Sequence, residues 1–489
     1  MFLYLAAILF LFYIWIKSIF TYWEKLGFPY VPGKFPLGST TNVGRTEHMS
    51  TFLTREYNNF KHKTPAFGIY HMLRPTLVLT DPELIKEILV KSFDNFHSHG
   101  IAINEKADPL NGNLFFKSGQ EWKDLRAKLS PTFTSGRMKM MFPLVSTIAD
   151  DMIEYLKDIV EKSDTHEMKG KFIHLSQQKV IASVAFGLDT KCHGNPNNDF
   201  RRMARSIFEP TAMENIKNLI IISSERISKL FNMSFNRQET TDFFLRIVRE
   251  NLEYREKNNV KRNDFFQLLI NIKNSEIGMT FNEIAANSFV FFAAGFETSS
   301  SVMTFSTYEL ALNQDIQDRL RSEIHEVLEK YNGEVSYDAI KEMKYLDMVF
   351  KETLRRYPAL DNQNRKSTHD FKIPNSKLII PAGTNIIIPV HGLHNDERFY
   401  ENPEKFDPER FSEENIKKRP SFVYIPFSEG GRMCIGYRFG TMESKVGLIK
   451  LFSVFRILPS EKTSIPFQFF PTVFFQTPLG GMGLKLQRL

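Results

Sequence analysis

The sequence predicts a mainly α-helical protein with small β-sheets, preceded by one membrane-anchoring helix. Two observations predict the body: several long stretches carry apolar residues at three- and four-residue spacing, and the strand signals are few and short. The anchor is predicted by residues 2–16, which are all apolar or aromatic. The chain of 489 residues contains no low-complexity run or repeat of fixed period, so we expect one large body rather than several domains.

The anchor prediction rests on the length of the apolar run and on the charges that follow it. A helix over residues 2–20 would be about 28 Å long, close to the ~30 Å thickness of the bilayer hydrocarbon. No positive charge precedes the run, which argues against a cleaved signal peptide. The first lysines lie at or beyond its end, so a cytosolic body and an interfacial Trp23 are expected. The predicted divisions are an anchor over 1–22, a Pro-containing neck over 23–36 and a globular body over 37–489.

The elements of the body are predicted from periodicity and turn residues. The strand signals form two pairs, at 67–70 with 76–80 and, joined by Pro381-Ala-Gly383, at 378–380 with 385–388. The stretch at 281–313 is apolar almost all round, which predicts a central helix. Helical periodicity predicts long helices at 137–162, 242–257, 281–313, 315–331, 343–357 and 435–455.

The composition excludes several classes of protein. Two cysteines in the whole chain argue against a disulfide framework and indicate a reducing compartment. The net charge of +7 is mildly basic, but no zinc-finger spacing or aromatic RNA-binding motif accompanies it, so no nucleic-acid partner is expected. The 46 phenylalanines either fill the core or line an apolar binding cavity.

One of the two cysteines, Cys434, lies in the glycine-rich stretch FSEGGRMCIG (427–436). A buried structural cysteine is one explanation, because a free cysteine packs like a small apolar residue. The alternative is a thiolate ligand, since Cys434 precedes a predicted helix whose N-terminus stabilises an anion. Gly430 and Gly436 would leave room for a large flat group and free amides for the sulfur, and Arg432 would neutralise an anionic edge of that group.

The predicted central helix carries two polar residues where burial is expected, Glu297 and Thr298. Thr298 lies one turn after Ala294, so the two share a face on which the small residue leaves space for a ligand and the hydroxyl donates to it. Glu297 points roughly 100° away and would relay protons from solvent. The structural alternative is that the hydroxyl bonds back to a preceding carbonyl and bends the helix slightly.

Two further pairs place charged side chains on one helix face. Trp122 and Arg126 would offer an indole N–H and a guanidinium to a carboxylate, or else serve core packing and solubility. Glu352 and Arg355 form an exposed pair of little energetic value or, if Arg410 joins them, a buried network that pins distant segments. A thiolate, close-approach glycines and carboxylate-seeking Arg and Trp side chains together describe haem held by an axial cysteine. The lack of a C-x-x-C-H motif predicts that the haem is non-covalent.

Taken in order, these motifs resemble the cytochrome P-450 superfamily over the whole chain, anchor included. The motifs are Trp122…Arg126, AGFET (294–298), Glu352…Arg355, PERF (408–411) and the stretch 427–436. Finer patterns such as DPLNGNLFFKSGQEWKDLRAKLSPTFTSGRMKMMF and LHNDERFYENPEKFDPERF are similar to those of microsomal insect enzymes that metabolise xenobiotics. The resemblance implies the cytochrome P-450 fold, with 37–489 as a haem-thiolate catalytic domain.

The resemblance also implies roles for single residues. Cys434 would be the axial metal ligand, and Thr298, assisted by Glu297, would deliver protons during dioxygen activation. The implied cofactor-binding residues are Trp122, Arg126, Ala294, Arg365, Phe427, Arg432, Cys434 and Gly436. The sequence departs from the family at Ser428, where glycine is usual, at Gly431 and Ala359, where proline is usual, at His99, where arginine is frequent, and over the polar stretch 361–364.

The implied reaction inserts one oxygen atom of dioxygen into a hydrophobic small molecule, either a xenobiotic such as a plant toxin or insecticide or an endogenous lipid or hormone. The implied cofactor is haem b (iron protoporphyrin IX), with electrons from NADPH through NADPH–cytochrome P-450 reductase and cytochrome b5 as an auxiliary partner. The implied location is the endoplasmic reticulum membrane, with the catalytic domain facing the cytosol. Three alternatives stay open: a haem-thiolate isomerase that consumes no dioxygen, a haem-binding protein without turnover, and a haem-free structural protein.

Two sets of surface and pocket residues are expected from their places beside these motifs. The candidate docking charges for the reductase, unless they form only a solvated basic face, are Lys123, Lys128, Lys417, Lys418 and Arg419. The candidate pocket linings, unless they are ordinary core residues, are Phe115, Phe116, Phe208, Phe291 and Phe474.

Overall fold

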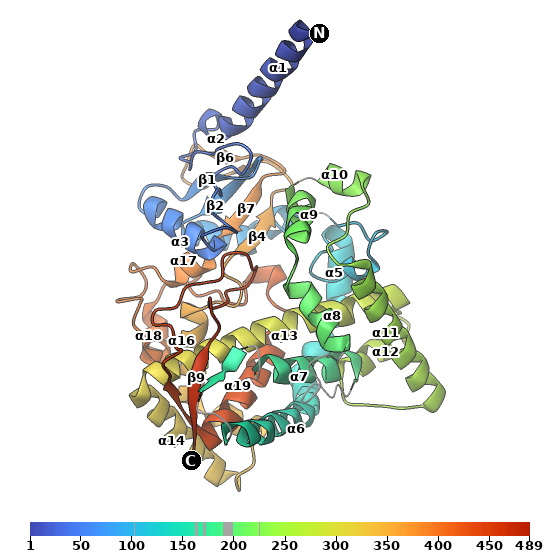
Figure 1. Ribbon diagram of the computed structural model, residues 1–489, viewed down its shortest axis with the longest axis vertical. Helices are drawn as coiled ribbons and strands as arrows, with labels where there is room; N and C mark the ends of the chain where they lie inside the picture. The colour runs from blue at the N-terminus through green and yellow to red at the C-terminus, as the bar shows by residue number, and fades with distance from the viewer. Residues whose placement is uncertain (102, 162–164, 170–172, 189–198, 224) are drawn as a thin grey trace.

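The fold is organised around one long helix, α13 (Phe281–Leu312), which crosses the body in Figure 1. It begins after Thr280, whose side chain forms a capping box with the first turn and so satisfies amides that the helix leaves unpaired. Gly295 in its middle lowers helix stability by about 1 kcal/mol relative to alanine. The packing explains this glycine, because a Cβ there would lie 2.8 Å from Ile181 Cδ1 on α7 (His174–Phe186). Gly295 therefore lets α7 approach the central helix closely.

The computed structural model describes residues 1–489 except 102, 162–164, 170–172, 189–198 and 224, so the second cysteine, Cys192, lies outside the described residues. Helices dominate the body, as predicted. The other described α-helices are α1 (Phe2–Phe20), α2 (Tyr22–Lys25), α3 (Met49–Phe60), α4 (Pro82–Lys86), α5 (Gly119–Leu129), α6 (Ser135–Val160), α8 (Asp199–Phe208), α9 (Ala212–Ser223), α10 (Glu225–Leu230), α11 (Gln238–Asn258), α12 (Phe265–Lys273), α14 (Gln314–Lys330), α15 (Tyr337–Glu342), α16 (Lys344–Arg356), α17 (Val390–His394), α18 (Glu413–Lys418) and α19 (Tyr437–Val454).

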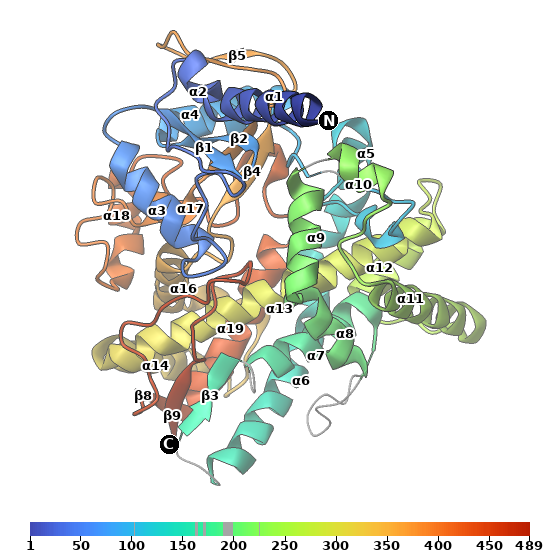
Figure 2. The same ribbon diagram turned by 45° about the horizontal axis from the view of Figure 1, so that its top comes forward.

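The long helices predicted from periodicity are confirmed. Each boundary of α6, α11, α13, α14, α16 and α19 lies within four residues of its predicted place, although the predicted end of the first, residue 162, is outside the described residues. Helices α7 and α19 both pack against α13, which crosses the body obliquely in Figure 2. The buried side chains of these helices form the largest core of the protein. The periodicity was informative because these helices bury one face or all faces.

Three small sheets accompany the helices. The strands are β1 (Ala66–His71), β2 (Arg74–Leu79), β3 (Thr165–Glu167), β4 (Gln363–Lys366), β5 (Phe371–Lys372), β6 (Ile379–Ile380), β7 (Asn385–Ile388), β8 (Phe455–Pro459) and β9 (Gly483–Arg488). The first sheet has the order β1-β2-β7-β4, in which β2 and β7 run parallel with Thr76 opposite Asn385 and the other neighbours run antiparallel. The other sheets, β3-β9-β8 and β5-β6, are antiparallel.

The second predicted strand pair is wrong as a pair. Both strands exist, but β6 pairs with β5, whereas β7 lies between β2 and β4 in the first sheet. The residues that connect them bond to Ser367 instead: its hydroxyl donates to Pro381 O at 2.7 Å, and Gly383 N donates to its carbonyl at 2.9 Å. The connection therefore leads from one sheet to another and does not close a hairpin.

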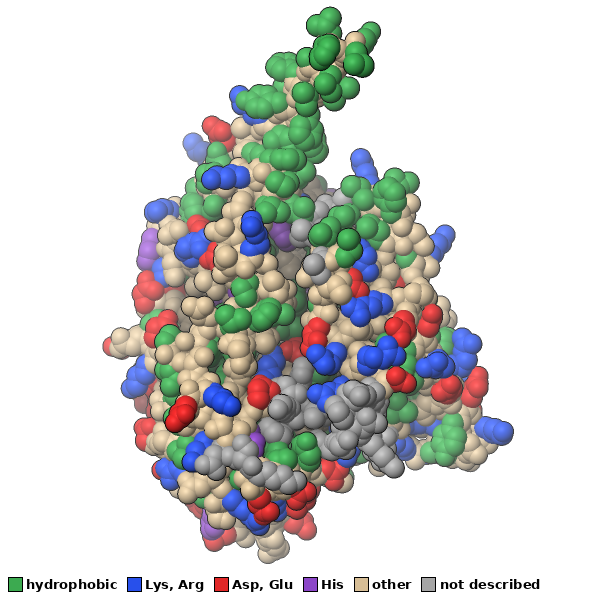
Figure 3. Space-filling model, in the orientation of Figure 1, with side chains coloured by type: hydrophobic (Ala, Val, Ile, Leu, Met, Phe, Trp, Pro, Cys, Tyr) green, Lys and Arg blue, Asp and Glu red, His purple; other side chains and the backbone are tan. Residues whose placement is uncertain are grey.

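Helix α1 projects from the body as a free-standing apolar helix (Figures 1 and 3). None of its residues is buried, and among the described helices it alone is long and apolar enough to cross a membrane. Its C-terminal end is fixed to β1, because Tyr70 Oη donates to Phe20 O at 2.9 Å and accepts from Trp23 N at 3.3 Å. Trp23 is fully buried against Gly68, and its indole N–H donates to Ile69 O at 3.0 Å. The predicted interfacial position of Trp23 is therefore wrong.

Candidate active site

Cys434 lies on a short loop directly before α19, as predicted. The loop is held by backbone hydrogen bonds, among them one from Cys434 N to Phe427 O at 2.8 Å. The Cys434 side chain lies deep in the protein and yet is not covered by other atoms, so it faces an interior space. Burial raises the pKa of its thiol, while the Gly436 amide, which donates to the sulfur, and the nearby Arg126 guanidinium lower it. A metal cation bound to the sulfur would favour the thiolate over the thiol.

The central helix presents a similar uncovered surface. Ala294 lies in the middle of α13, between turns whose side chains are buried, and is nevertheless exposed. On the cysteine loop, a Cβ added to Gly436 would have only Phe133 within 4 Å, at 3.9 Å, so the loop is open on that side too. We infer that Cys434 and Ala294 border the same interior space. Small residues on both sides leave room there for a flat ligand.

Three arginines from distant parts of the chain converge beside the cysteine loop, and we call them the cationic site: Arg126 on α5, Arg365 on β4 and Arg432 on the loop itself. Arg126 Nη2 donates to a carbonyl of the loop at 2.9 Å, and Arg432 donates to three backbone carbonyls at distances between 2.5 and 3.1 Å. Arg365 has fewer bonds. Its Nη1 donates to Asn364 O at 2.8 Å, its Nη2 donates to Ser428 Oγ at 3.0 Å, and its Nε has no acceptor.

No carboxylate of the described residues neutralises the cationic site. Burial lowers the pKa of Arg126, and it lowers the pKa of Arg365 to about 10. Burial, together with the positive charges of the other two arginines, lowers the pKa of Arg432 to about 9. Like charges in a region of low dielectric constant are unfavourable unless an anion joins them. The donor set therefore fits an anionic ligand, and the two propionates of haem match planar, bidentate guanidinium donors.

Two ring side chains extend the cationic site. The Arg432 guanidinium lies 4.2 Å from the ring centre of Trp122, which is 4% exposed, so the indole packs against the charge. Burial and then the charges of Arg365 and Arg432 lower the pKa of His99 well below its usual value, and its Nδ1 lies 3.0 Å from Phe115 O. An anion bound between the arginines would offset their effect on His99.

Thr298 and Glu297 on α13 point in different directions. The Thr298 hydroxyl donates back to Ala294 O at 2.5 Å. This is the hydrogen bond to a preceding carbonyl that the sequence predicts as the alternative to a bond with a ligand. Glu297 is 4% exposed and forms an ion pair with the buried Lys169, with 2.8 Å between Oε1 and Nζ. Lys169 also donates to Thr477 Oγ1 at 2.8 Å. A buried cation thus holds Glu297 next to the turn that carries Thr298.

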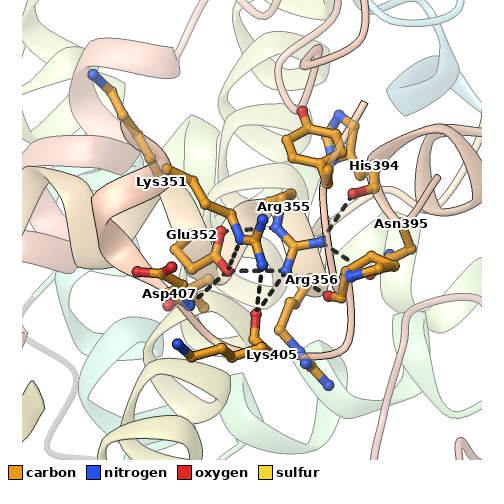
Figure 4. A network of polar contacts seen from close by, with 12 residues as sticks. Lys351, Glu352, Arg355, Arg356, His394, Asn395, Lys405 and Asp407 are labelled. Carbon is orange, nitrogen blue, oxygen red and sulfur yellow. Dashed lines mark hydrogen bonds and ion pairs between the residues drawn. The ribbon is translucent and has the colours of Figure 1, made fainter. Parts of the chain in front are cut away.

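The pair formed by Glu352 and Arg355 is buried and forms the network shown in Figure 4. Both side chains are 0% exposed, and Arg355 donates to the two carboxylate oxygens of Glu352 at 2.7 and 2.9 Å. Arg410 joins as predicted, with its Nε 3.4 Å from Glu352 Oε1. Arg355 also donates to His394 O at 3.0 Å, and His394 Nε2 accepts from Ile425 N at 2.9 Å. The Glu352 network therefore ties α16 to the segment that leads into the cysteine loop.

The structure gives Gly430 a packing reason: its φ is +72°, and a Cβ there would collide with Leu89 O. Two other sequence-based expectations are wrong. Arg419 is not a free docking charge, because its guanidinium lies 4.4 Å from the ring centre of Phe411 and close to two further aromatic rings. Phe291 stacks on other phenylalanines in the core and serves packing. Among the other candidate docking charges, carboxylates pair with Lys123, Lys128 and Lys418.

Sequence reasoning did not find Lys169, and it identified Ser428 only as a departure from the family pattern. Nothing in the sequence around Lys169 marks it, because it comes from a different element and far earlier in the chain than Glu297. Ser428 did carry a signal, since it stands where the family that the sequence resembles usually has glycine. Its hydroxyl contact with Arg365 joins two distant segments, and only the folded chain reveals it.

Comparison with known proteins agrees with this geometry. A family model described as Cytochrome P450 matches residues 31–483. "Cytochrome P450 6a9" of Drosophila melanogaster is 40% identical over 478 residues, which cover 96% of this chain and 95% of the relative. "Cytochrome P450 6A1" of Musca domestica is 39% identical over 484 residues, covering 97% and 95%. "Cytochrome P450 6a2" of Drosophila melanogaster is 38% identical over 488 residues, covering 96% of each chain.

The family match covers nearly all of the body, and the relatives match the chain from end to end. The unneutralised arginines lie beside the loop that carries the thiol, and the central helix is uncovered at Ala294, which is consistent with haem-thiolate binding. The chain belongs to the cytochrome P450 family and is a haem-thiolate P450 monooxygenase.

Proposed function

We propose that this monooxygenase inserts one oxygen atom of dioxygen into hydrophobic small molecules, either xenobiotics such as plant toxins and insecticides or endogenous lipids and hormones. The observation that carries the proposal is the convergence of three unneutralised arginines, two of them buried, beside an uncovered cysteine. The sequence resemblance to insect enzymes that metabolise xenobiotics supports the substrate class. Aromatic side chains against α13 also support an apolar substrate: Phe208 lies 5.6 Å from Phe296 and 5.9 Å from Phe475, between ring centres.

The cofactor in this proposal is haem b, bound without a covalent link. When bound, it supplies the activation of dioxygen and the transfer of one oxygen atom to the substrate. Cys434 would hold the iron through its sulfur, and the backbone amide of Gly436, which donates to that sulfur, would tune it. The side chains assigned to the propionates are Trp122, Arg126, Arg365 and Arg432. The residues assigned to the rim and faces of the ring are Phe427, Ala294 and Gly436.

We assign proton delivery to Thr298 and Glu297. A threonine in a helix divides between two rotamers, so the hydroxyl that donates to Ala294 O in this structure has an alternative direction. In that direction Thr298 Oγ1 would donate its proton into the interior space beside Ala294. Glu297, paired with Lys169 at 2.8 Å, would accept a proton from outside and pass it on.

The electrons in this proposal come from NADPH through NADPH–cytochrome P450 reductase, with cytochrome b5 as a second donor. We place the enzyme on the endoplasmic reticulum membrane, with α1 within the proposed anchor 1–22 and the catalytic domain, 37–489, in the cytosol. Exposed apolar side chains at the same end of the molecule as α1 support this placement (Figure 3). They lie on and next to α9 and α10, with exposed fractions between 55 and 78%, and are Met213, Ile216, Leu230 and Phe231.

The test uses the purified full-length enzyme reconstituted with the reductase in lipid vesicles. The wild type should show the carbon monoxide difference band of a reduced haem-thiolate protein and should transfer isotopically labelled dioxygen oxygen to members of a panel of plant toxins, insecticides, fatty acids and steroids. Cys434→Ser should lose both properties, because an alcohol does not replace a thiolate as the axial ligand. The matched control is Cys192→Ser, the only other cysteine of the chain, which should keep both.

The outcomes separate the competing functions. Label-free products with no NADPH consumption would indicate an isomerase, and a haem-thiolate band without any product would indicate a binding protein. A band and a turnover that both survive in Cys434→Ser would overturn the assignment of the site.

A further inference from the structure

Ser428 has a backbone conformation that is unfavourable for serine. Its φ is +63°, in the left-handed region where a Cβ meets the backbone. Among the described residues, eight that are not glycine have positive φ, and five of these are asparagine, which tolerates this region best. Glycine would adopt the same conformation without a steric penalty. The serine is therefore retained against local backbone preference, which points to a use for its side chain.

The hydroxyl of Ser428 contacts one of the arginines of the cationic site. Arg365 Nη2 donates to Ser428 Oγ at 3.0 Å, and Arg365 is 2% exposed. The other bond of this guanidinium goes to the carbonyl of Asn364, its neighbour in the chain, and its Nε has no acceptor. Within the described part of the chain, Ser428 thus provides the side-chain contact that fixes the direction of Arg365.

The other two members of the cationic site are fixed in different ways. Arg432 donates to three backbone carbonyls and packs on Trp122, so its position does not depend on a single contact. Arg126 donates to the carbonyl of Met433 within the cysteine loop. Arg365 alone depends on a hydroxyl, and that hydroxyl belongs to the loop that carries Cys434. The contact therefore joins β4 to the cysteine loop at the point where the arginines converge.

We propose that Ser428 is a positioning residue for the cofactor: its hydroxyl accepts from Arg365 and so directs the remaining N–H groups of the guanidinium toward a haem propionate. The inference rests on the proposed haem site. Ser428 itself need not touch the haem, because it acts through the orientation of Arg365. Outer contacts of this kind tune affinity and electronic properties of a bound group without changing the ligands themselves.

Three substitutions separate the hydroxyl from the backbone conformation. Ser428→Ala keeps the Cβ and removes the acceptor, whereas Ser428→Gly removes both the acceptor and the steric penalty. Ser428→Asn restores an acceptor, the side-chain carbonyl, in a residue that tolerates positive φ. The control is Asn375→Gly, an exposed residue with φ of +56° at a distance from the arginines in the chain.

Two readouts are measured on the holoenzyme, the rate of haem transfer to an excess of haem-free myoglobin and the midpoint temperature of thermal unfolding. Ser428→Ala and Ser428→Gly should both release haem about tenfold faster than the wild type, because an outer contact of a bound group is lost. The haem-loaded Ser428→Gly enzyme should nevertheless have an unfolding midpoint at or above that of the wild type, because glycine adopts the positive φ without a steric penalty. Ser428→Asn should return the release rate to within about threefold, and Asn375→Gly should leave it unchanged.

A second-site test assigns the effect to Arg365. In an Arg365→Met background, Ser428→Ala should add nothing to the haem release rate, because the group that it positions is gone. Equal acceleration in the presence and absence of Arg365 would overturn the proposal, and so would a Ser428→Gly enzyme that is more stable but holds haem as the wild type does. A failure of the proposed haem site would show differently, as a wild type without a haem-thiolate spectrum.

Discussion

The Glu352 network and the cationic site both gather arginines inside the protein, yet they differ in what neutralises them. In the network, Arg355 and Arg410 share the buried carboxylate of Glu352 and also bond to backbone carbonyls. In the cationic site, burial lowers the pKa of each of the three guanidinium groups, the charges of the other two lower that of Arg432 further, and no carboxylate of the described residues neutralises them. One cluster is electrostatically complete within the chain, and the other is incomplete.

This difference separates a structural role from a binding role. A buried ion pair with full hydrogen bonding fixes segments relative to one another, and the removal of one partner leaves an unpaired charge. Buried cations without an anion are unfavourable on their own, so a fold retains them where a ligand supplies the missing charge. The same residue type thus has opposite meanings in two places, and the presence or absence of a carboxylate distinguishes them.

The largest effect is expected from Glu352→Gln, which keeps the shape of the side chain and removes its charge. Arg355, 0% exposed, would then be buried without a counter-ion, which typically destabilises a protein by about 3–5 kcal/mol. We expect a strong fall in the yield of folded enzyme and in its thermal unfolding temperature. The matched control is Glu404→Gln, an exposed partner of Arg356 at 3.5 Å, which should change stability by less than about 0.5 kcal/mol. Similar unfolding temperatures for the two variants would contradict a structural role for the network.

A smaller effect of opposite sign is expected at Asp361, a buried carboxylate that faces His48, with 3.5 Å between Oδ2 and Nδ1. Burial lowers the pKa of His48 to about 4, so its imidazole is neutral over most of the range from pH 4 to 7. Burial raises the pKa of Asp361 to about 7, although hydrogen bonds from Asn362 and Ser50 lower it. Because its folded pKa lies above its unfolded value of about 3.9, the carboxyl stabilises the fold below pH 4, and this contribution is lost as the pH rises toward 7. The loss is at most about 4 kcal/mol, from roughly three pKa units at 1.36 kcal/mol each.

Asp361→Asn should therefore flatten the dependence of stability on pH between 4 and 7 and should raise stability at pH 8. Urea unfolding of the two proteins at several pH values in this range measures the difference. The control is Asp124→Asn, at an exposed position on α5, which should leave the wild-type pH profile unchanged. A profile of Asp361→Asn parallel to that of the wild type would mean that the carboxylate is solvated or paired in solution.

The smallest effect on the fold, but a clear one on the cofactor, is expected from Arg365→Met. Methionine fills a similar volume and removes a buried charge that has no carboxylate partner, so the enzyme should fold to a similar yield. Haem should leave it about tenfold faster, or about 1.4 kcal/mol in the activation free energy. Arg365→Lys, which keeps the charge but not the planar fork, should lie between the two. Unchanged haem release in Arg365→Met would remove this arginine from the propionate site.

Much of this organisation could be predicted from the sequence. The long helices followed from periodicity, because a helix that buries one face repeats its apolar residues along the chain. The position of Cys434 before α19 and the pairing of Glu352 with Arg355 were also predicted, because both depend on residues close together in the sequence. Contacts between distant segments did not. The pairing of Lys169 with Glu297 depends on how the residues just after β3 lie against α13, and local patterns carry no information about that.

The sheets show the same limit from another direction. The residues of β6 and β7 were identified as strands, but their partners are set by other parts of the chain, and the turn-like residues between them are also compatible with a passage between sheets. Ser428 combines a feature that the sequence reveals with a contact that only the fold reveals. Its identity was noticeable in the sequence, whereas its conformation and its contact with Arg365 depend on the folded loop.

The attachment of α1 to the body has a practical consequence for how the enzyme is held at a bilayer. Since the Tyr70 hydroxyl is hydrogen-bonded to both Phe20 O and Trp23 N, the last turn of α1 is fixed to β1 and is not joined to the body by a flexible linker. In the proposed membrane-bound state, a tilt of α1 would therefore be transmitted to the first sheet. A shortened enzyme made for work without detergent should start upstream of Trp23, because cutting after it would remove the buried indole that packs against Gly68 and would loosen the first sheet.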